Sequence, residues 1–393
     1  MRIGYSDDSE ALRQTLRSYY DTLLSPEVRQ RLSHSRGIGS DMRAVVRQMG
    51  HDGWLGIGWP PEYGGQGRTP IEQFVFFDES MRAQAPVPML TINTVGPTIM
   101  HYGTTVQRQF FLPKILAGEI HFCIGYSEPG AGTDLAALQT RAVRDGDEYI
   151  VNGHKIWTSL ASDADYCWLA VRTNPEAKKH KGISMIIVDM KHTDGITVRP
   201  LDLLPGHDVC EVFFDDVRVP VANRVGEENG GWNLITNQLN HERVTLCSPG
   251  MIEHHLDEVK EWAKATLGAD GRRVIDDEWV RIALARLYAR LEFLRLINWK
   301  VAWTGTQGKL DVADASTVKV FGTEFYLESF RLLMEIIGQR SYLKRGSPEA
   351  MPLGRLETLY RSLIILTFGG GTNEVQRDLI GMFGLGLPRA LRG

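Results

Sequence analysis

The 393-residue sequence is poor in cysteine, and its few cysteines are widely spaced. The four of them, Cys123, Cys167, Cys210 and Cys247, include no CxxC pair and have no close histidine partner. This spacing fits neither a structural zinc site nor the disulfide framework of a small secreted domain. We therefore expect four reduced thiols, as in a cytoplasmic protein.

The sequence also lacks a strong excess of charge and any long apolar run. Its formal net charge of −4 gives no electrostatic case for binding nucleic acid or an anionic membrane. No apolar stretch approaches the ~20 residues that a membrane helix needs. The first residues, MRIGYSDDSEALRQ, lack the apolar region of a signal peptide. We expect a soluble, cytoplasmic protein without a membrane or nucleic-acid partner.

Several common catalytic and metal-binding patterns are missing as well. There is no GK[ST] phosphate loop, and Ser127 does not lie in a GxSxG elbow. His254 and Glu258 are four residues apart, with His255 and Asp257 between them, and could suggest a metal cluster. No third ligand lies within reach in sequence, so we expect an exposed helix face and no metal. The basic run 178–181 reads as a solvated hairpin turn.

The composition is that of an ordinary globular protein, and the sequence divides into three successive regions with different residue patterns. Its length suits two or three domains. Residues 1–121 repeat apolar side chains at helical spacing, for example at Leu12, Leu16 and Leu23. Residues 122–230 consist of short β-branched and aromatic runs between turns, without crossover helices, which predicts an antiparallel sheet. Residues 231–393 form long amphipathic segments again, the first over 232–268. The predicted class is α+β, with no internal repeat.

Four motifs carry the chemical signal. They are FCIGYSEPGAGTD at 122–134, NGHKIWTS at 152–159, FFDDVRVP at 213–220 and GTNEVQR at 371–377. Taken singly, the first is equally consistent with a tight interdomain turn, and Trp157 with a core aromatic residue. Together, in this order and with the helix–sheet–helix texture, they resemble the acyl-CoA dehydrogenase family over essentially the whole chain.

The resemblance implies a fold and a cofactor. The fold is a helical N-terminal domain, a central antiparallel β domain and a C-terminal four-helix bundle. FAD would lie between the β domain and the bundle, with Trp157 packed on the flavin and Ser159 near its N5. The cofactor-binding residues carried over by position are Tyr126, Ser127, Gly132, Thr133, Trp157, Ser159, Thr372 and Glu374.

The reaction of that family requires a base. The α-hydrogen of a thioester is weakly acidic, so a base and donors to the developing enolate oxygen are needed, and flavin must accept the β-hydride. Most family members carry the base in the segment that reads FGGGTNE here, where its position is Gly370. A minority place it before an arginine on the first long helix of the bundle, which makes Glu242 the base. Taken alone, a glutamate on such a helix is usually solvated.

The resemblance also assigns the substrate contacts. The N–H of Gly370 would donate to the thioester oxygen, and Thr133, Asn240 and Arg243 would bind the acyl-CoA substrate. The two segments that should grip the neighbouring subunit's FAD are altered, at 264–268 and 335–341, where Glu335 would put a carboxylate near a pyrophosphate. This pattern resembles the catalytic α-subunits of actinobacterial α2β2 acyl-CoA dehydrogenases that act in steroid side-chain β-oxidation.

These implications leave alternatives. The expected assembly is a heterotetramer with a homologous β-subunit, passing electrons to an acceptor such as electron-transfer flavoprotein. A homotetrameric dehydrogenase of long- or branched-chain fatty acyl-CoA is a second possibility. An oxidase or monooxygenase of the same fold, and a non-catalytic structural subunit, are the others.

Overall fold

The computed structural model describes residues 4–34, 38–204, 208–243, 247–308, 311–343, 347 and 355–389. The chain divides into two compact units, neither of them continuous in sequence. We call Leu23–Arg68 with Pro86–Glu242 the sheet unit, and Met1–Thr22, Thr69–Ala85 and Arg243–Gly393 the helical unit. The first and third predicted ranges therefore each contribute to both units, and the three-domain division stays a prediction.

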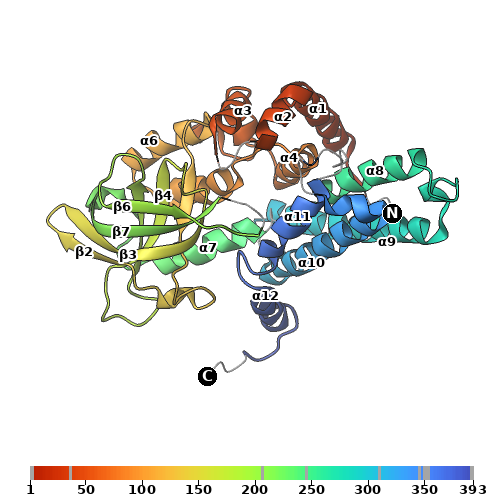
Figure 1. Cartoon of the computed structure of the whole chain (residues 1–393). Coiled ribbons are helices and arrows are strands. Elements are labelled where there is room, and N and C mark those ends of the chain that lie inside the picture. Colours follow the sequence, from red (N-terminus) through yellow and green to blue (C-terminus); the bar gives the residue numbers. More distant parts are fainter. Residues whose placement is uncertain are drawn as a thin grey trace. The chain divides into compact units, whose positions relative to one another are not determined.

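The sheet unit is built on eight strands. Their bounds are β1 (Phe122–Gly125), β2 (Arg141–Asp145), β3 (Glu148–Ser159), β4 (Tyr166–Arg172), β5 (Ile183–Asp189), β6 (Ile196–Pro200), β7 (Val209–Pro220) and β8 (Arg224–Val225). The sheet order is β6-β7-β3-β2-β4-β5-β8, with β1 paired to β4 (Figure 1).

Most strand pairs are antiparallel, which confirms the expectation from sequence. The pairing of β1 with β4 is parallel, and β2 touches β4 in the same sense. The chain between β1 and β4 contains the β2–β3 hairpin, which lets β4 return alongside β1 without a crossover helix. The basic run 178–181 lies in the β4–β5 connection, as predicted.

Helices flank this sheet. They are α2 (Pro26–His34), α3 (Ser40–His51), α5 (Gly96–Tyr102), α6 (Thr105–Leu116) and α7 (Gly231–Arg243), with a π-helical turn at Thr91–Val95. Gly231, at the start of α7, lies against the β5 backbone, where an added Cβ would come within 2.9 Å of the Ile183 carbonyl oxygen. Only glycine permits this approach, so the first turn of α7 is anchored to the sheet.

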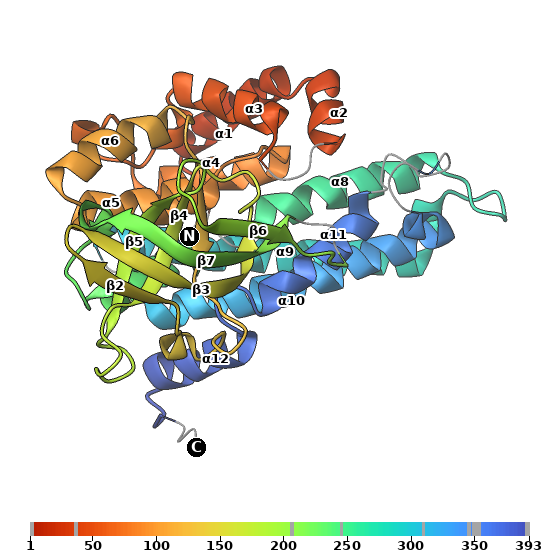
Figure 2. The same ribbon diagram turned by 60° about the vertical axis from the view of Figure 1, so that its left-hand side comes forward.

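The helical unit contains the other main helices. These are α1 (Asp7–Leu23), α4 (Pro70–Ala83), α8 (Pro249–Ala265), α9 (Glu278–Thr306), α10 (Val312–Ile337), α11 (Arg355–Leu363) and α12 (Asn373–Leu379). Helices α8, α9 and α10 lie side by side in Figures 1 and 2. Their facing side chains, including Leu287, Phe325 and Phe330, are fully buried.

The segment expected over 232–268 is two helices rather than one. Helix α7 ends at Arg243, and α8 starts afresh at Pro249. Ser248 caps α8 by accepting a hydrogen bond from the Gly250 N–H. Proline at the first helical position favours this start, because its missing N–H would have no partner there anyway.

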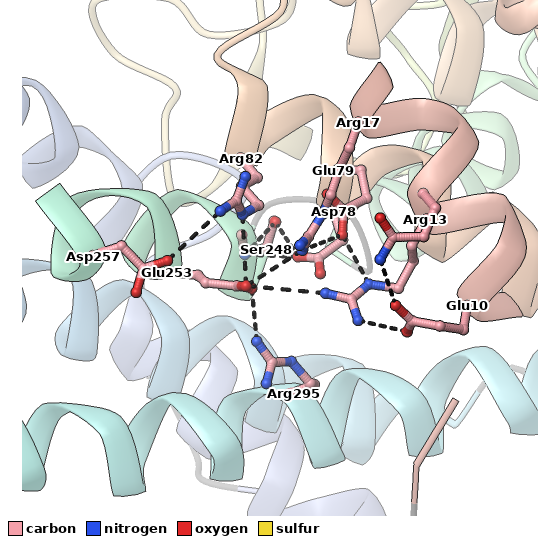
Figure 3. Close-up of polar contacts among 12 residues, drawn as sticks. Glu10, Arg13, Arg17, Asp78, Glu79, Arg82, Ser248, Glu253, Asp257 and Arg295 are labelled. Atoms are coloured by element: carbon pink, nitrogen blue, oxygen red, sulfur yellow. Dashed lines mark hydrogen bonds and ion pairs between the residues drawn. The ribbon is translucent and has the colours of Figure 1, made fainter. Parts of the chain in front are cut away.

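A buried ion network ties α1, α4, α8 and α9 together (Figure 3). Arg13 and Arg17 of α1 each donate to the Glu79 carboxylate at 2.8 Å. Arg295 of α9 donates to Glu253 of α8, also at 2.8 Å. Because the Glu79 side chain is 1% exposed, its charge depends on these arginines for compensation.

Asp78 lies at the centre of the same region, fully buried beside Glu79. Its Oδ1 accepts from the Ser248 hydroxyl at 2.6 Å (Figure 3). It also accepts from the Gly250 N–H at 2.7 Å, and the two bonds hold the start of α8. Burial, only partly opposed by these donors, raises the pKa of Asp78 to about 6.

All four cysteines are free, and all four are buried. Over the described residues, no helix combines the length and apolar character needed to cross a bilayer.

Candidate active site

Strand β1 leads directly into residues 126–134, the rest of the first motif, which we call the motif loop. Tyr126 is almost buried, and the Ser127 carbonyl accepts from the Ile156 N–H at 3.0 Å, which joins the loop to β3. The next residue, Glu128, forms a turn with Ala131 through two backbone hydrogen bonds. The loop is thus held at both of its ends.

A buried ion pair fixes the same loop from beneath. Lys155 of β3 donates to the Glu128 carboxylate at 2.8 Å and to the Tyr126 carbonyl at 3.0 Å. The backbone N–H groups of Gln139 and Thr140 also donate to Glu128. Burial disfavours the carboxylate, yet Lys155 and these donors together hold the pKa of Glu128 below its usual value. The pair is rigid, because each charge is buried and paired.

The outer side of the loop is open. Gly132 and Thr133 are exposed, and an added Cβ at Gly130 or Gly132 would meet no atom within 4 Å. On β3, Trp157 is 56% exposed and has a φ of 63°, at an irregular stretch of the pairing between β3 and β7. A large aromatic residue held exposed in a left-handed conformation is strained and typical of a functional site. Ser159, two residues on, is also exposed.

Helix α7 is clamped to this loop by one side chain. Gln238 accepts a hydrogen bond at its Oε1 from the Tyr126 hydroxyl and another, at 3.0 Å, from the Trp168 indole N–H. All three side chains are buried. Because residues four apart share a helix face, position 242 lies one turn further along the face that carries Gln238.

Three predicted site residues occupy the end of α7. Asn240, Glu242 and Arg243 have helical backbone, within the last turn of Gly231–Arg243. Their side chains lie outside the described part of the chain, so their roles stay predictions.

The remaining predicted residues belong to the helical unit. Gly370 and Gly371 have φ angles of 67° and 95°, a left-handed turn that glycine adopts readily. Thr372 then caps α12, accepting from the Val375 N–H at 3.2 Å. Glu374 is exposed, and its pKa is lowered by its own backbone N–H and by the Thr372 hydroxyl. The glycine turn therefore ends in a well-formed helix start.

The predicted residues thus fall into two sets. The sheet unit carries the loop, Trp157, Ser159 and the α7 position of Glu242. The helical unit carries Gly370, Thr372 and Glu374.

The histidine cluster on α8 differs from the expectation. His255 is 1% exposed rather than on an open face, and its Nδ1 lies 2.9 Å from Glu258. Its Nε2 lies 3.2 Å from the Gln84 amide nitrogen, and Arg355 donates to the Gln84 carbonyl. These hydrogen bonds make Nε2 of His255 an acceptor and place its proton on Nδ1. Neither ring nitrogen is then free to bind a cation. Ligand atoms of His254, His255 and Glu258 lie within 4.8 Å of one another, but both ring nitrogens of His255 are taken up by hydrogen bonds to Glu258 and Gln84.

Sequence reasoning missed Gln238 and Lys319. Gln238 precedes Glu242 by one helical turn, a spacing that could have suggested shared orientation. Lys319 lies between Val318 and Val320 inside an apolar helical stretch, and a lone cation in such a stretch is seldom buried without a purpose.

Comparison with known proteins identifies the class. Residues 6–119, 123–217 and 229–385 match the N-terminal, middle and C-terminal domains of acyl-CoA dehydrogenases, respectively. The chain belongs to the acyl-CoA dehydrogenase family, and it is an enzyme of that family in sequence and fold.

Particular relatives are similar over the full length. The chain is 58% identical to acyl-CoA dehydrogenase FadE26 of Mycobacterium tuberculosis over 402 residues, covering 100% of both. It is 57% identical to a chain of the ChsE4–ChsE5 complex from the same organism, with a TM-score of 0.93, covering 99% of this chain and 100% of that one. It is 48% identical to a chain of the Tcur3481–Tcur3483 steroid ACAD, with a TM-score of 0.94 and the same coverage.

Proposed function

We propose that the protein catalyses FAD-dependent α,β-dehydrogenation of an acyl-CoA thioester to the trans-2-enoyl-CoA, with Glu242 as the base. The observation that carries the proposal is the Gln238 clamp. It connects the motif loop, through Tyr126, to the helix face on which position 242 lies. A base on that face and a cofactor on the loop would be neighbours within one unit.

The residues present fit a bound flavin. The space over Gly130 and Gly132 admits a ligand close to the backbone, and the exposed Trp157 offers a flat apolar surface. The hydroxyls of Ser127, Thr133 and Ser159 could donate to it, and Thr372 and Glu374 would add contacts from the helical unit. Bound FAD would supply the acceptor for the β-hydride, a task that no side chain can perform.

The chain's own groups would handle the proton and the developing charge. Glu242 would take the α-proton, while the Gly370 N–H would donate to the thioester oxygen as negative charge builds there. Gly370 itself cannot serve as a base, which leaves Glu242 as the carboxylate for the reaction. Thr133, Asn240 and Arg243 would hold the CoA arm.

We infer the substrate and the assembly from the relatives. A steroid ACAD and a two-component complex are among the similar structures, which supports a bulky steroid side-chain acyl-CoA and an α2β2 assembly with a homologous subunit. A chain in a structure of an electron transferring flavoprotein from Acidaminococcus fermentans is also similar, at 25% identity, and we propose an electron-transfer flavoprotein as the electron acceptor.

An exposed apolar stripe on α9 supports the proposal of a partner subunit. The side chains of this stripe are 42% to 61% exposed and recur at spacings of three or seven residues, apart from one gap of eleven; they are Trp279, Ile282, Phe293, Leu296 and Trp303. They share one face over about 36 Å of helix. An exposed apolar surface of this length is typical of a protein interface.

The test is the flavin spectrum of the chain co-expressed with a homologous subunit. Adding a steroid side-chain acyl-CoA without oxygen should bleach the oxidised flavin band. Rapid oxygen uptake on readmitting air would favour an oxidase instead. A flavin-loaded complex that no acyl-CoA bleaches would contradict the proposal.

A further inference from the structure

Lys319, in the middle of α10, is a fully buried cation that the proposed reaction does not yet use. Its side chain has no solvent exposure. Its ammonium donates to the Thr367 carbonyl at 3.2 Å and to the Gly371 carbonyl at 2.7 Å. It also donates to the Asn373 side-chain oxygen at 2.7 Å. An ammonium has three N–H donors, so these acceptors occupy all of them.

The three acceptors come from one short segment, and they bracket Gly370. Thr367 lies three residues before it, and Gly371 and Asn373 follow it. On the far side, the Gly369 N–H donates to the Ile365 carbonyl at 2.7 Å. None of the hydrogen bonds described for residues 355–389 uses the N–H of Gly370.

The turn needs such support because its own residues are permissive. Gly370 and Gly371, both at positive φ, have no side chains to restrict the backbone, and glycine loses more conformational freedom on ordering than any other residue. Burying an ammonium is costly unless it is well bonded, so Lys319 has one favourable position, against these oxygens. A fixed cation on these two carbonyls therefore fixes the peptide groups that flank Gly370 on both sides.

A second layer fixes Asn373. Its amide nitrogen donates to the Thr323 hydroxyl at 3.1 Å and to Glu324 at 3.2 Å, both on α10. Lys319 and Thr323 are four apart and so lie on the same face of α10. This face thus holds the glycine turn and the start of α12 as one body.

We propose that Lys319 is a positioning residue for the dehydrogenation: through the Thr367 and Gly371 carbonyls it sets the direction of the Gly370 N–H. This rests on the proposed function, in which that N–H stabilises the developing enolate oxygen. A preorganised donor is effective only when already aimed at the oxygen, and loss of one such donor costs about 10²–10³ in rate. Lys319 acts on this donor only through the backbone, so its loss should slow the reaction less than loss of the donor itself.

The experiment isolates the proton step from hydride transfer. The probe is an acyl-CoA with sulfur in place of the β-carbon, which can lose an α-proton but has no β-hydride. In D₂O the base removes the α-proton and returns a deuteron, with no net oxidation. Mass spectrometry of the thioester gives the exchange rate per bound flavin, at saturating probe, for the complex with its partner subunit.

Lys319→Met should slow α-exchange about 10- to 100-fold while probe affinity and flavin content stay within a few-fold of the unmodified complex. Lys319→Arg, which keeps the charge and the donors, should recover part of the rate. Lys260→Met is the matched control, since Lys260 is an exposed lysine of the same unit, on α8. The control should exchange at the unmodified rate.

Unchanged exchange in flavin-loaded Lys319→Met would overturn the proposal. If that variant does not retain flavin, Asn373→Ser decides, because it removes one acceptor and leaves Lys319 in place. It should slow exchange about threefold, by the same donor argument, and a rate equal to the unmodified complex would overturn the proposal. An unmodified complex that binds the probe but exchanges no α-proton would contradict the proposed function itself, and the role of Lys319 with it.

Discussion

At the residue scale, the helical unit depends on a few buried charges with unusual surroundings. Asp78 and Glu79 are consecutive on α4 and both buried, yet they are handled differently. Glu79 is compensated by Arg13 and Arg17, whereas the hydrogen-bond donors described for Asp78 are the neutral Ser248 hydroxyl and Gly250 N–H. Two arginines therefore pair with the Glu79 carboxylate, while burial raises the pKa of Asp78 to about 6.

The sign of the pH effect follows for Asp78. Its folded pKa lies above the unfolded value of 3.8, so the folded state holds more protons between these values. Stability contributed by this group is present at low pH and is lost as pH rises through about 6. Asp78→Asn keeps an oxygen acceptor for Ser248 and Gly250 without the charge.

We therefore expect Asp78→Asn to gain about 1 kcal/mol relative to the unmodified protein between pH 5 and pH 7. Denaturant midpoints of the flavin-loaded complex at both pH values measure it. Glu261→Gln, at an exposed glutamate of α8, should show no such gain. A constant difference between the two proteins across this range would mean that Asp78 is ionised throughout.

At the scale of single elements, α7 is the helix on which the proposed chemistry depends. Its first turn is anchored where Gly231 meets β5, and its middle is held by Gln238. The final turn carries the position of Glu242. Small shifts of this helix would move the base relative to the motif loop, and a misplacement of about 1 Å can cost roughly 10²-fold in rate.

Gln238→Leu keeps the side-chain volume but removes the oxygen that accepts from the Tyr126 hydroxyl and the Trp168 indole. Loss of a buried acceptor weakens the hydrogen bonding of these donors and costs about 1–3 kcal/mol, so the melting temperature should fall. Turnover should fall further than stability alone explains, about tenfold or more, because α7 is freed from the loop. Thr236→Val, on the exposed face of α7, is the control, since its hydroxyl bonds only to carbonyls of its own helix. Turnover equal to that control would show that the clamp does not position the base.

The sequence predicted where the helices and strands lie better than which of them pack together. Periodicity located the helical and strand regions, and the motifs located the loop and the glycine turn. The sequence did not show that α1 and α4 belong to the same compact unit as the C-terminal helices. That grouping rests on contacts such as Arg13 with Glu79, 66 residues apart. The break at Ser248–Pro249 and the burial of His255 likewise depend on tertiary neighbours, here Asp78 and Gln84.

At the scale of the whole molecule, the proposed site needs a partner subunit. FAD carries a pyrophosphate that favours arginine or backbone N–H donors, and the proposed assembly would place Glu335 in the segment that should contact a neighbour's cofactor. The chain alone should therefore bind FAD poorly. With a homologous subunit it should form an α2β2 complex holding two flavins.

Native mass spectrometry of the chain expressed alone and with its partner measures this. Ile282→Glu, in the apolar stripe of α9, should prevent the complex from forming. Tyr288→Glu should not, because Tyr288 is equally exposed at 58% but lies on another face of the helix. A stable homotetramer with four flavins would refute the heterotetramer while leaving the base assignment standing.

The most direct test of the central claim is the rate of flavin reduction by the Glu242→Gln complex, measured without oxygen against the unmodified complex. Glutamine matches glutamate in size but cannot take a proton, so folding, flavin content and acyl-CoA binding should persist. The rate should fall by at least ~10²–10⁴, the contribution of a general base. A Glu242→Gln complex that is reduced at close to the unmodified rate would contradict the account, because the α-proton would then leave to some other group.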